Sequence, residues 1–178
     1  VFHGRLYGAG NEGNKAAGVY RYEGGVEWSL CGRLPGVDQV YSFATHHGAF
    51  HAGTWPDAAV FRYDGDETWT HCGRLGDEME VMPMMVYNGR LYAGTLPLAE
   101  VYRYDGGANW SPVGRLDWTP DVKYRRVWSM AVFQGKLFCG TLPSGRVHAL
   151  QVGVNATYDR ALSPGRRHVA AVRRSERL

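Results

Sequence analysis

The sequence predicts an all-β fold of about four repeated sheets, each with four antiparallel strands. Three observations point to it: near-copies of one 16-residue segment recur along the chain, shorter strand-length runs recur in register with them, and Gly, Tyr and Trp are abundant. The 178 residues include 24 Gly, 11 Tyr and 6 Trp. Aromatic side chains pack well on pleated sheets and glycine serves tight turns, so this composition favours turn-rich β structure.

The repeated segment has three clear copies and one worn copy. It reads VYRYEGGVEWSLCGRL at 19–34, VFRYDGDETWTHCGRL at 60–75 and VYRYDGGANWSPVGRL at 101–116. The worn copy, VHALQVGVNATYDRAL, begins at Val147. The spacing between the starts of successive copies is 41 to 46 residues.

Two shorter elements precede the copies in register. One reads NGRLYAGT at 88–95 and the other reads VMPMMVY at 81–87, with counterparts in neighbouring periods. Each period therefore holds four runs of strand length, which is typical of a β-propeller blade. One small sheet cannot cover both of its faces, so we expect the copies to stack around a common axis and bury each other.

The second blade illustrates the expected strand order. Its strands are predicted at Val40–His46, Ala49–Thr54, Ala59–Tyr63 and Thr68–Gly73. A tight turn at Gly48 joins the first two. The four blades are expected to occupy residues 1–34, 35–75, 76–116 and 117–162.

The two ends of the chain are complementary. The first blade lacks nearly all of its first strand, whereas HVAAV at 168–172 resembles WSMAV at 128–132. Residues 163–178 are therefore expected to supply an extra strand that closes the ring or begins a further blade or domain. The ends fit either a small closed ring or a fragment of a larger propeller, and the abrupt start at Val1 favours the fragment.

Charge and cysteine content argue against several partners. The net charge is +3, but residues 159–178 hold six Arg against Asp159 and Glu176, which gives +4 there and −1 for the rest. No groove-reading motif accompanies this basic segment, so nucleic-acid binding is not expected. No apolar run is long enough to span a membrane.

Cys31 and Cys72 fall at one position of successive copies, too far apart for a disulfide, so the three cysteines are expected to be small buried residues.

The hairpins within the copies resemble a known repeat. YEGGVEW at 22–28, YDGDETW at 63–69 and YDGGANW at 104–110 resemble the Asp-box, or bacterial neuraminidase repeat, of sialidase-like propellers, and kelch-type propellers are a weaker comparison. The matching residues are Asp64, Asp105, Gly107, Thr68, Trp28, Trp69 and Trp110, whereas Arg21, Arg62 and Arg103 replace the serine of the pattern. The resemblance implies scaffold roles, in which Asp accepts hydrogen bonds from turn N–H groups and Trp wedges between blades.

A second resemblance lies near the end of the chain. LSPGRRHVAAVRR at 162–174 is similar to a strand of laminin G-like or concanavalin-like jelly rolls. It implies that a carbohydrate-associated domain begins there.

The arginines and histidines of the repeats are expected to be structural. Arg21, Arg62 and Arg103 recur at one position, so each should serve its own blade, for example by stacking on a tyrosine. His46 aligns with Tyr87 and His51 with Tyr92, which favours packing roles. Three rings in HHGAFH would bind a metal only if they converged, and strand alternation opposes this. We therefore assign no catalytic residue, no metal ligand and no cofactor.

We expect the functional residues at positions where the sequences of the repeats differ. In a propeller the connections between blades and the loops between the second and third strands emerge on one face, and the non-repeating residues gather in these segments. Aromatic rings stack on the apolar face of a sugar while polar groups bind its hydroxyls, although the tryptophans could also simply cap blade edges. The candidate ligand-binding residues are Trp55, Asp57, Glu78, Glu80, Glu100, Trp118, Asp121, Tyr124, Arg125 and Arg146.

These residues predict a non-catalytic module that presents a binding face for carbohydrate or protein. Two alternatives stay open: a fragment of a sialidase-like glycoside hydrolase propeller, and an architectural spacer. An extracellular or periplasmic bacterial protein is the expected setting. An incomplete ring would expose apolar blade faces and could form a homo-oligomer.

Overall fold

The computed structural model describes residues 1–11 and 17–150, together with the backbones of strands 156–160 and 169–173. The described residues form strands and turns, with no helix among them. The first sheet contains β1 (Tyr7–Gly10), β2 (Gly18–Gly24) and β3 (Glu27–Arg33), and the second contains β4 (Gln39–His46), β5 (Ala49–Trp55), β6 (Ala59–Gly65) and β7 (Thr68–Arg74). The third contains β8 (Glu80–Tyr87), β9 (Arg90–Leu96), β10 (Glu100–Gly106) and β11 (Asn109–Arg115).

The fourth sheet contains five strands, which are β12 (Arg126–Phe133), β13 (Lys136–Leu142), β14 (Val147–Leu150), β15 (Ala156–Arg160) and β16 (Val169–Arg173). All neighbours within the four sheets are antiparallel and follow chain order. The predicted all-β architecture is confirmed, and the first sheet has three strands. The jelly-roll resemblance at 162–174 falls outside the described residues except for β16, which pairs with β15.

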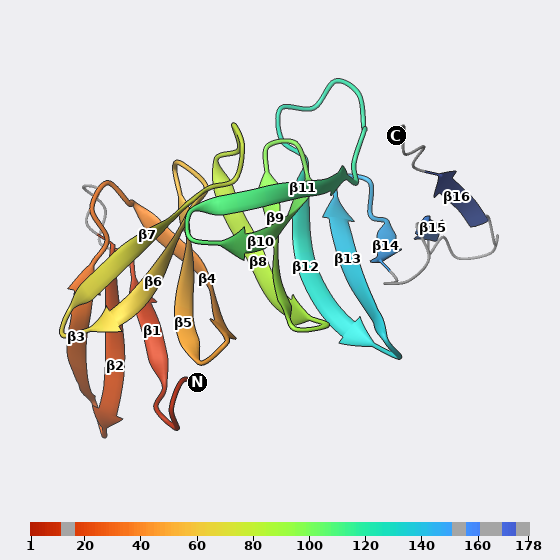
Figure 1. Cartoon of the computed structure of the whole chain (residues 1–178). Coiled ribbons are helices and arrows are strands. Elements are labelled where there is room, and N and C mark those ends of the chain that lie inside the picture. The colour runs from red at the N-terminus through yellow and green to blue at the C-terminus, as the bar shows by residue number, and fades with distance from the viewer. Residues whose placement is uncertain (12–16, 151–155, 161–168, 174–178) are drawn as a thin grey trace.

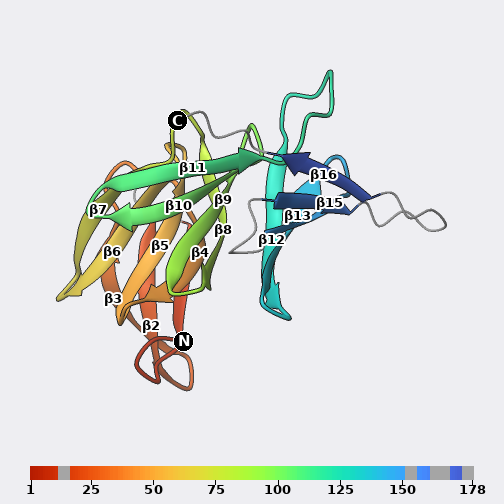
Figure 2. The ribbon, with the colours of Figure 1, turned by 45° about the vertical axis from the view of Figure 1, so that its right-hand side comes forward.

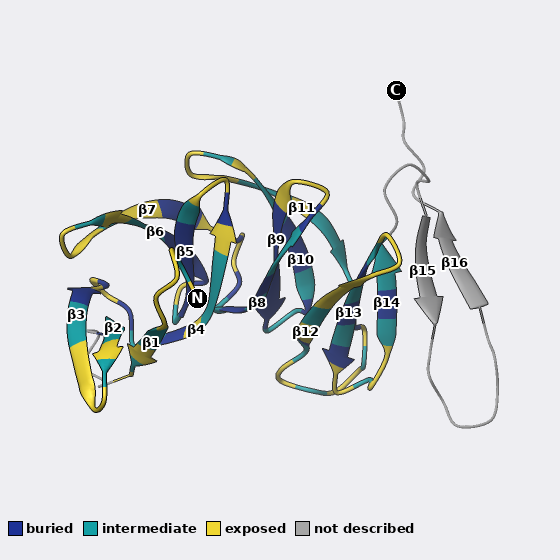
Figure 3. Cartoon of the chain, turned by 90° about the horizontal axis from the view of Figure 1, so that it is seen from below, coloured by how far each residue is buried: buried dark blue, intermediate teal, exposed yellow. Residues whose placement is uncertain are grey.

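The sheets follow one another along the molecule, from β1–β3 through β4–β7 and β8–β11 to β12–β16 (Figures 1 and 2). The first strands β4, β8 and β12 lie along one side, and the outer strands β7 and β11 lie along the other (Figure 3). This arrangement fits propeller blades, and no closure of a ring is seen among the described strands. Within the described part of the chain, no helix is long and apolar enough to cross a membrane.

Each junction between sheets has its own apolar core, built from equivalent repeat positions. Val19 of β2, Val60 of β6 and Val101 of β10 are fully or almost fully buried, one at each junction. Further buried side chains from the opposing sheets complete these cores, such as Val40, Val81 and Val127. Burying one such side chain contributes about 1.5–3 kcal/mol. Equivalent residues of successive copies therefore make equivalent contacts, because each sheet covers one face of its neighbour.

The tryptophans of the hairpins bind the preceding sheet, as predicted. Trp69 donates its indole N–H to the carbonyl oxygen of Cys31 at 2.7 Å, and Trp110 donates to Cys72 at 2.8 Å. Trp28 holds the same position in the first sheet, has no sheet before it in the described residues, and is 45% exposed. All three cysteines are buried and free, as expected, and burial raises the pKa of Cys139 to about 12.

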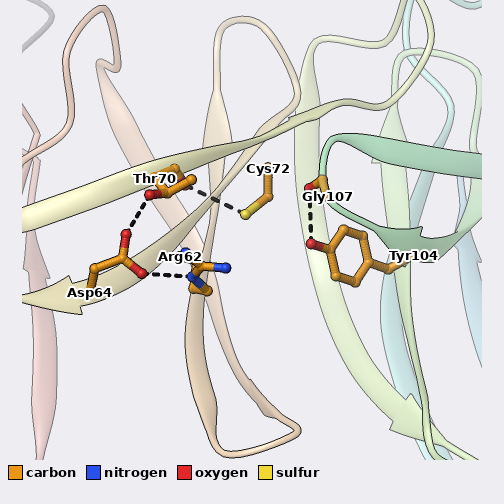
Figure 4. Close-up of polar contacts among 6 residues, drawn as sticks. All are labelled: Arg62, Asp64, Thr70, Cys72, Tyr104 and Gly107. Carbon is orange, nitrogen blue, oxygen red and sulfur yellow. Dashed lines mark hydrogen bonds and ion pairs between the residues drawn. The ribbon is translucent and has the colours of Figure 1, made fainter.

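A network of side chains repeats on the third and fourth strands (Figure 4). Arg62 donates through Nε to Asp64 at 2.7 Å, and Thr70 donates to the other carboxylate oxygen. Hydrogen bonds from these two side chains lower the pKa of Asp64. Equivalent sets in the third and first sheets are Arg103, Asp105 and Ser111, and Arg21 with Glu23.

This network confirms that each arginine serves its own blade and corrects two details of the expectation. The guanidinium pairs with the carboxylate two residues further along the same strand rather than stacking on tyrosine. Alternate residues of a strand share one face, which brings the two groups together. The carboxylates accept hydrogen bonds from the side chains of Arg and Ser or Thr rather than from turn N–H groups.

Candidate functional site

The predicted loops gather at one end of the sheets, and we call this end the loop face. In Figure 1 the long connection between β11 and β12 projects there, while the β4–β5, β8–β9 and β12–β13 turns lie at the opposite end. Backbone hydrogen bonds join the loops: Ala58 N–H binds the Met79 carbonyl at 2.9 Å, and Arg125 N–H binds the Pro97 carbonyl at 2.8 Å. Each connection is thus tied to the loop of the sheet before it.

Glu78 is buried inside the loop face rather than displayed on it, since the residue is 1% exposed. Its Oε2 accepts the Leu98 N–H at 3.1 Å, and its Oε1 has no hydrogen-bond partner among the described residues. Burial raises the pKa of Glu78, and the Leu98 hydrogen bond opposes that rise only in part. The carboxylate holds the loop between β9 and β10 in place.

Asp117 has a similar role in the connection that leads to the fourth sheet, and no sequence pattern distinguished it. Its Oδ1 accepts hydrogen bonds from the Thr119 N–H at 2.9 Å and the Thr119 hydroxyl at 2.7 Å, and its Oδ2 accepts the Ser144 N–H at 3.1 Å. Burial opposes ionisation, but these hydrogen bonds outweigh it and lower the pKa of Asp117 to about 2. Ser144 and Leu98 occupy equivalent positions of the repeat, so Glu78 and Asp117 anchor equivalent loops of the third and fourth sheets.

Trp118 lies directly after this anchor and is 71% exposed. The Arg115 guanidinium stacks on its indole, with Cζ 4.1 Å from the ring centroid. Further along, the Lys123 ammonium lies 4.9 Å from the centroid of Tyr124. Arg125 closes the connection, since its Nε donates to the Thr119 carbonyl at 2.6 Å.

The other predicted residues occupy separate places on the loop face. Trp55 ends β5 and is half-buried, and exposed Asp57 lies 3.9 Å from the Arg74 guanidinium. Glu80 accepts a long hydrogen bond from Tyr41 at 3.4 Å, and burial raises the pKa of Glu80.

Three predicted residues remain. Glu100 accepts the Tyr102 hydroxyl at 2.5 Å, the Arg146 carbonyl accepts the Thr141 N–H at 2.9 Å, and Asp121 is an exposed residue with φ of 56°. The connection 117–125 meets the loop at 97–100 through a backbone bridge between Leu98 and Arg125. No hydrogen bond or ring contact in the described residues joins Trp55 or Asp57 to Trp118.

A cavity of about 600 Å³ lies at the opposite end, between the second and third sheets, and sequence reasoning missed it. We call it the turn cavity, and its lining residues are His46, His47, Ala49, His51, Arg62, Asn88, Gly89, Arg90, Tyr104, Asp105 and Gly106. The His46 ring centroid is 4.1 Å from that of His47 and 6.2 Å from that of His51.

The expectation that alternation separates these histidines is therefore wrong. His46 pairs with Ala49 across the β4–β5 hairpin, so His51, two residues beyond Ala49, lies on the same face of the sheet as His46. No group of three or more His, Cys, Asp or Glu side chains in the described residues could hold a metal ion. The signal in the sequence was that both aromatic-to-histidine changes fall in one blade.

No protein-family model matches this chain, and no curated protein matches it either. Its function is therefore inferred from the geometry of its side chains.

Proposed function

We propose that the chain is a non-catalytic propeller-repeat module, with Asp-box-like hairpins, whose loop face binds carbohydrate in an extracellular or periplasmic bacterial protein. The observation that carries the proposal is Trp118, an exposed indole between two anchored residues. Solvent-exposed tryptophan on a fixed loop offers a flat apolar surface, and the ring faces of sugars stack on such surfaces.

The anchoring of the loop matters because binding then orders little of the chain. Asp117 binds Thr119 and Ser144, and Arg125 binds Thr119 and Pro97. Trp118 lies inside this set of hydrogen bonds. A preorganised loop loses less conformational entropy when a ligand binds, which increases affinity.

Polar groups on the same connection suit the hydroxyls of a sugar. Asp121 and Lys123 are exposed, and Tyr124 is 36% exposed. A carboxylate accepts hydrogen bonds, an ammonium donates them and a phenol does both. Together with the indole, they make the mixed aromatic and polar surface that carbohydrate recognition needs.

The non-catalytic part of the proposal is supported by how the candidate catalytic groups are engaged. The repeat arginines pair with acids on their own strands. The shorter of two tyrosine–carboxylate hydrogen bonds described on this face joins Tyr102 to Glu100, and this tyrosine is 6% exposed. Burial and then the Glu100 hydrogen bond raise the pKa of Tyr102, so its hydroxyl stays protonated.

The Asp-box-like assignment is supported by Asp64, Asp105 and the tryptophan contacts. Each carboxylate binds a hydroxyl on the fourth strand of its sheet, and Trp69 and Trp110 reach the preceding sheet. These contacts support a scaffold role for the hairpins, away from the loop face.

A glycan array probed with the wild type, Trp118→Ala and Trp28→Ala tests the proposal. Trp28 is a matched control because it is also an exposed tryptophan but lies on a hairpin of the first sheet. We expect glycan binding that Trp118→Ala weakens at least 10-fold, about 1.4 kcal/mol, and that Trp28→Ala leaves unchanged. An array with no wild-type signal would refute carbohydrate binding, and turnover of a fluorogenic sialoside would refute the non-catalytic assignment.

A further inference from the structure

The turn cavity occurs at a junction where two residues depart from the repeat. At the position of His46 the other sheets have Phe2, Tyr87 and Phe133, and at the position of His51 they have Tyr7, Tyr92 and Phe138. The fold is therefore built with carbocyclic aromatic rings at both positions. The second sheet alone places imidazoles there.

His46 retains the contact that joins the sheets. Its Nε2 lies 3.0 Å from the Gly89 carbonyl oxygen, which is the carbonyl of the next β-turn. At the following junction, Tyr87 donates its hydroxyl to the equivalent Gly135 carbonyl at 2.7 Å. Since a tyrosine makes this contact equally well, the contact does not explain the histidine.

Of the two histidines that depart from the repeat, His51 is the one with an unsatisfied polar atom. The residue is 2% exposed, and its Nδ1 is buried without a hydrogen-bond partner in the described residues. A buried polar atom without a hydrogen-bond partner destabilises the fold, and a tyrosine or phenylalanine at this position would avoid that penalty. A local cost at one exceptional position of a repeat is typical of a functional site.

The imidazole rings are smaller than the tyrosine rings at the neighbouring junction, so they leave space between the second and third sheets. The centroids of His46 and His51 lie 6.1 and 5.9 Å from that of Tyr104, and the cavity opens beside these three rings. Its volume of about 600 Å³ falls within the range of small-molecule sites.

The charges around the turn cavity favour an anion. Arg62 is balanced by Asp64, and Asp105 is balanced by Arg103, in the networks described above. Arg90 lines the cavity, is exposed, and makes no ion pair within the described part of the chain. The lining therefore has one cation in excess, beside imidazoles that can donate N–H groups.

We propose that the turn cavity is a second binding site, for a small organic anion that presents a carboxylate or phosphate group to Arg90. Arg62 and the imidazole N–H groups supply further donors to the anion. Guanidinium groups bind both kinds of oxyanion through paired N–H donors. This site lies at the opposite end of the sheets from Trp118, so it does not depend on the proposed function.

Isothermal titration of the full chain with D-glucuronate, D-glucose 6-phosphate and D-glucose tests this site. The two acids separate carboxylate from phosphate recognition, and the neutral sugar controls for the ring. We expect at least one acid to bind and glucose to bind at least 10-fold more weakly. Failure of both acids to bind, or equal binding of glucose, would overturn the proposal.

Two variants locate the binding. Arg90→Gln should raise the dissociation constant at least 10-fold, whereas Lys136→Gln, at the equivalent turn position of the fourth sheet, should leave it unchanged. The double change of His46→Tyr and His51→Tyr copies the third sheet and should fill the cavity and abolish binding. Wild-type affinity in Arg90→Gln would overturn the proposal even if the double variant did not fold. Trp118→Ala should bind the acids as the wild type does.

Discussion

The junction between the second and third sheets differs from that between the third and fourth in the rings at two repeat positions. The junction between the second and third sheets, which we call the second junction, has His46 and His51. The junction between the third and fourth sheets, which we call the third junction, has Tyr87 and Tyr92 at these positions. In both, a side chain from the first strand binds a turn carbonyl of the next sheet. The hydrogen bond that joins the sheets is thus independent of ring type, and the rings are free to vary.

The close approach of a hairpin to the sheet before it recurs along the chain. A Cβ atom on Gly73 would collide with the Ala108 carbonyl in the hairpin of the third sheet, and one on the equivalent Gly32 would collide with the Glu67 carbonyl in the hairpin of the second. The second and third sheets are therefore in contact both at this hairpin and at the turn whose Gly89 carbonyl binds His46.

Substituting Gly73 should have the largest effect. Gly73→Ala places a side chain at φ of 91° and against a backbone carbonyl, so we expect a loss of about 3 kcal/mol or more in the free energy of unfolding. Gly65 has a φ of 96° but faces open space. Gly65→Ala should therefore lower the free energy of unfolding only through the unfavourable backbone conformation, by about 1–2 kcal/mol. Urea unfolding of the two variants measures this difference, and equal losses at Gly73 and Gly65 would show that the hairpin contact is unimportant.

His51 should make the second junction sensitive to acid. Burial, with smaller contributions from His46 and Arg62, lowers the pKa of His51 to about 4, against an ordinary value near 6.5. Between these values the unfolded chain binds a proton that the folded chain does not, so stability falls as the pH falls from about 6.5 to 4. The expected loss is about 2 kcal/mol, less than the full pKa difference would give, because the charge is partly screened.

Thermal or urea unfolding at pH 7 and pH 4.5 checks this expectation. His51→Tyr makes the second junction resemble the third at this position, so the variant should lose less stability on acidification than the wild type. His71→Ala is a suitable control, since His71 is an exposed histidine of the same sheet. If the wild type and His51→Tyr lost the same amount, the neutral buried imidazole would not be the cause.

The sequence was sufficient for the sheets and insufficient for the cavity, for a physical reason. Strands were predictable because alternation and turn glycines are local, and the predicted Ala49–Thr54 and the observed Ala49–Trp55 differ by one residue. The contact of Trp69 with the preceding sheet was predictable because the hairpin recurs. The turn cavity depends on ring volume across a junction, which an alignment of His51 with Tyr92 does not express. The burial of Asp117 depends on an expanded connection that has no counterpart in the other blades.

Removing the indole hydrogen bond of Trp110 should change stability by only a small amount. The test compares a hairpin that contacts the preceding sheet with the Trp28 hairpin, which has no described sheet before it. Trp110→Phe keeps an aromatic ring but removes the N–H donor to the Cys72 carbonyl, which should cost about 1 kcal/mol in the free energy of unfolding. Trp28→Phe should be nearly neutral because the Trp28 indole makes no such bond to any described residue and is 45% exposed. Urea unfolding of both variants provides the measurement. A larger loss for Trp28→Phe would mean that the hairpin tryptophans stabilise their own sheets, and that the sheets are joined by their apolar cores alone.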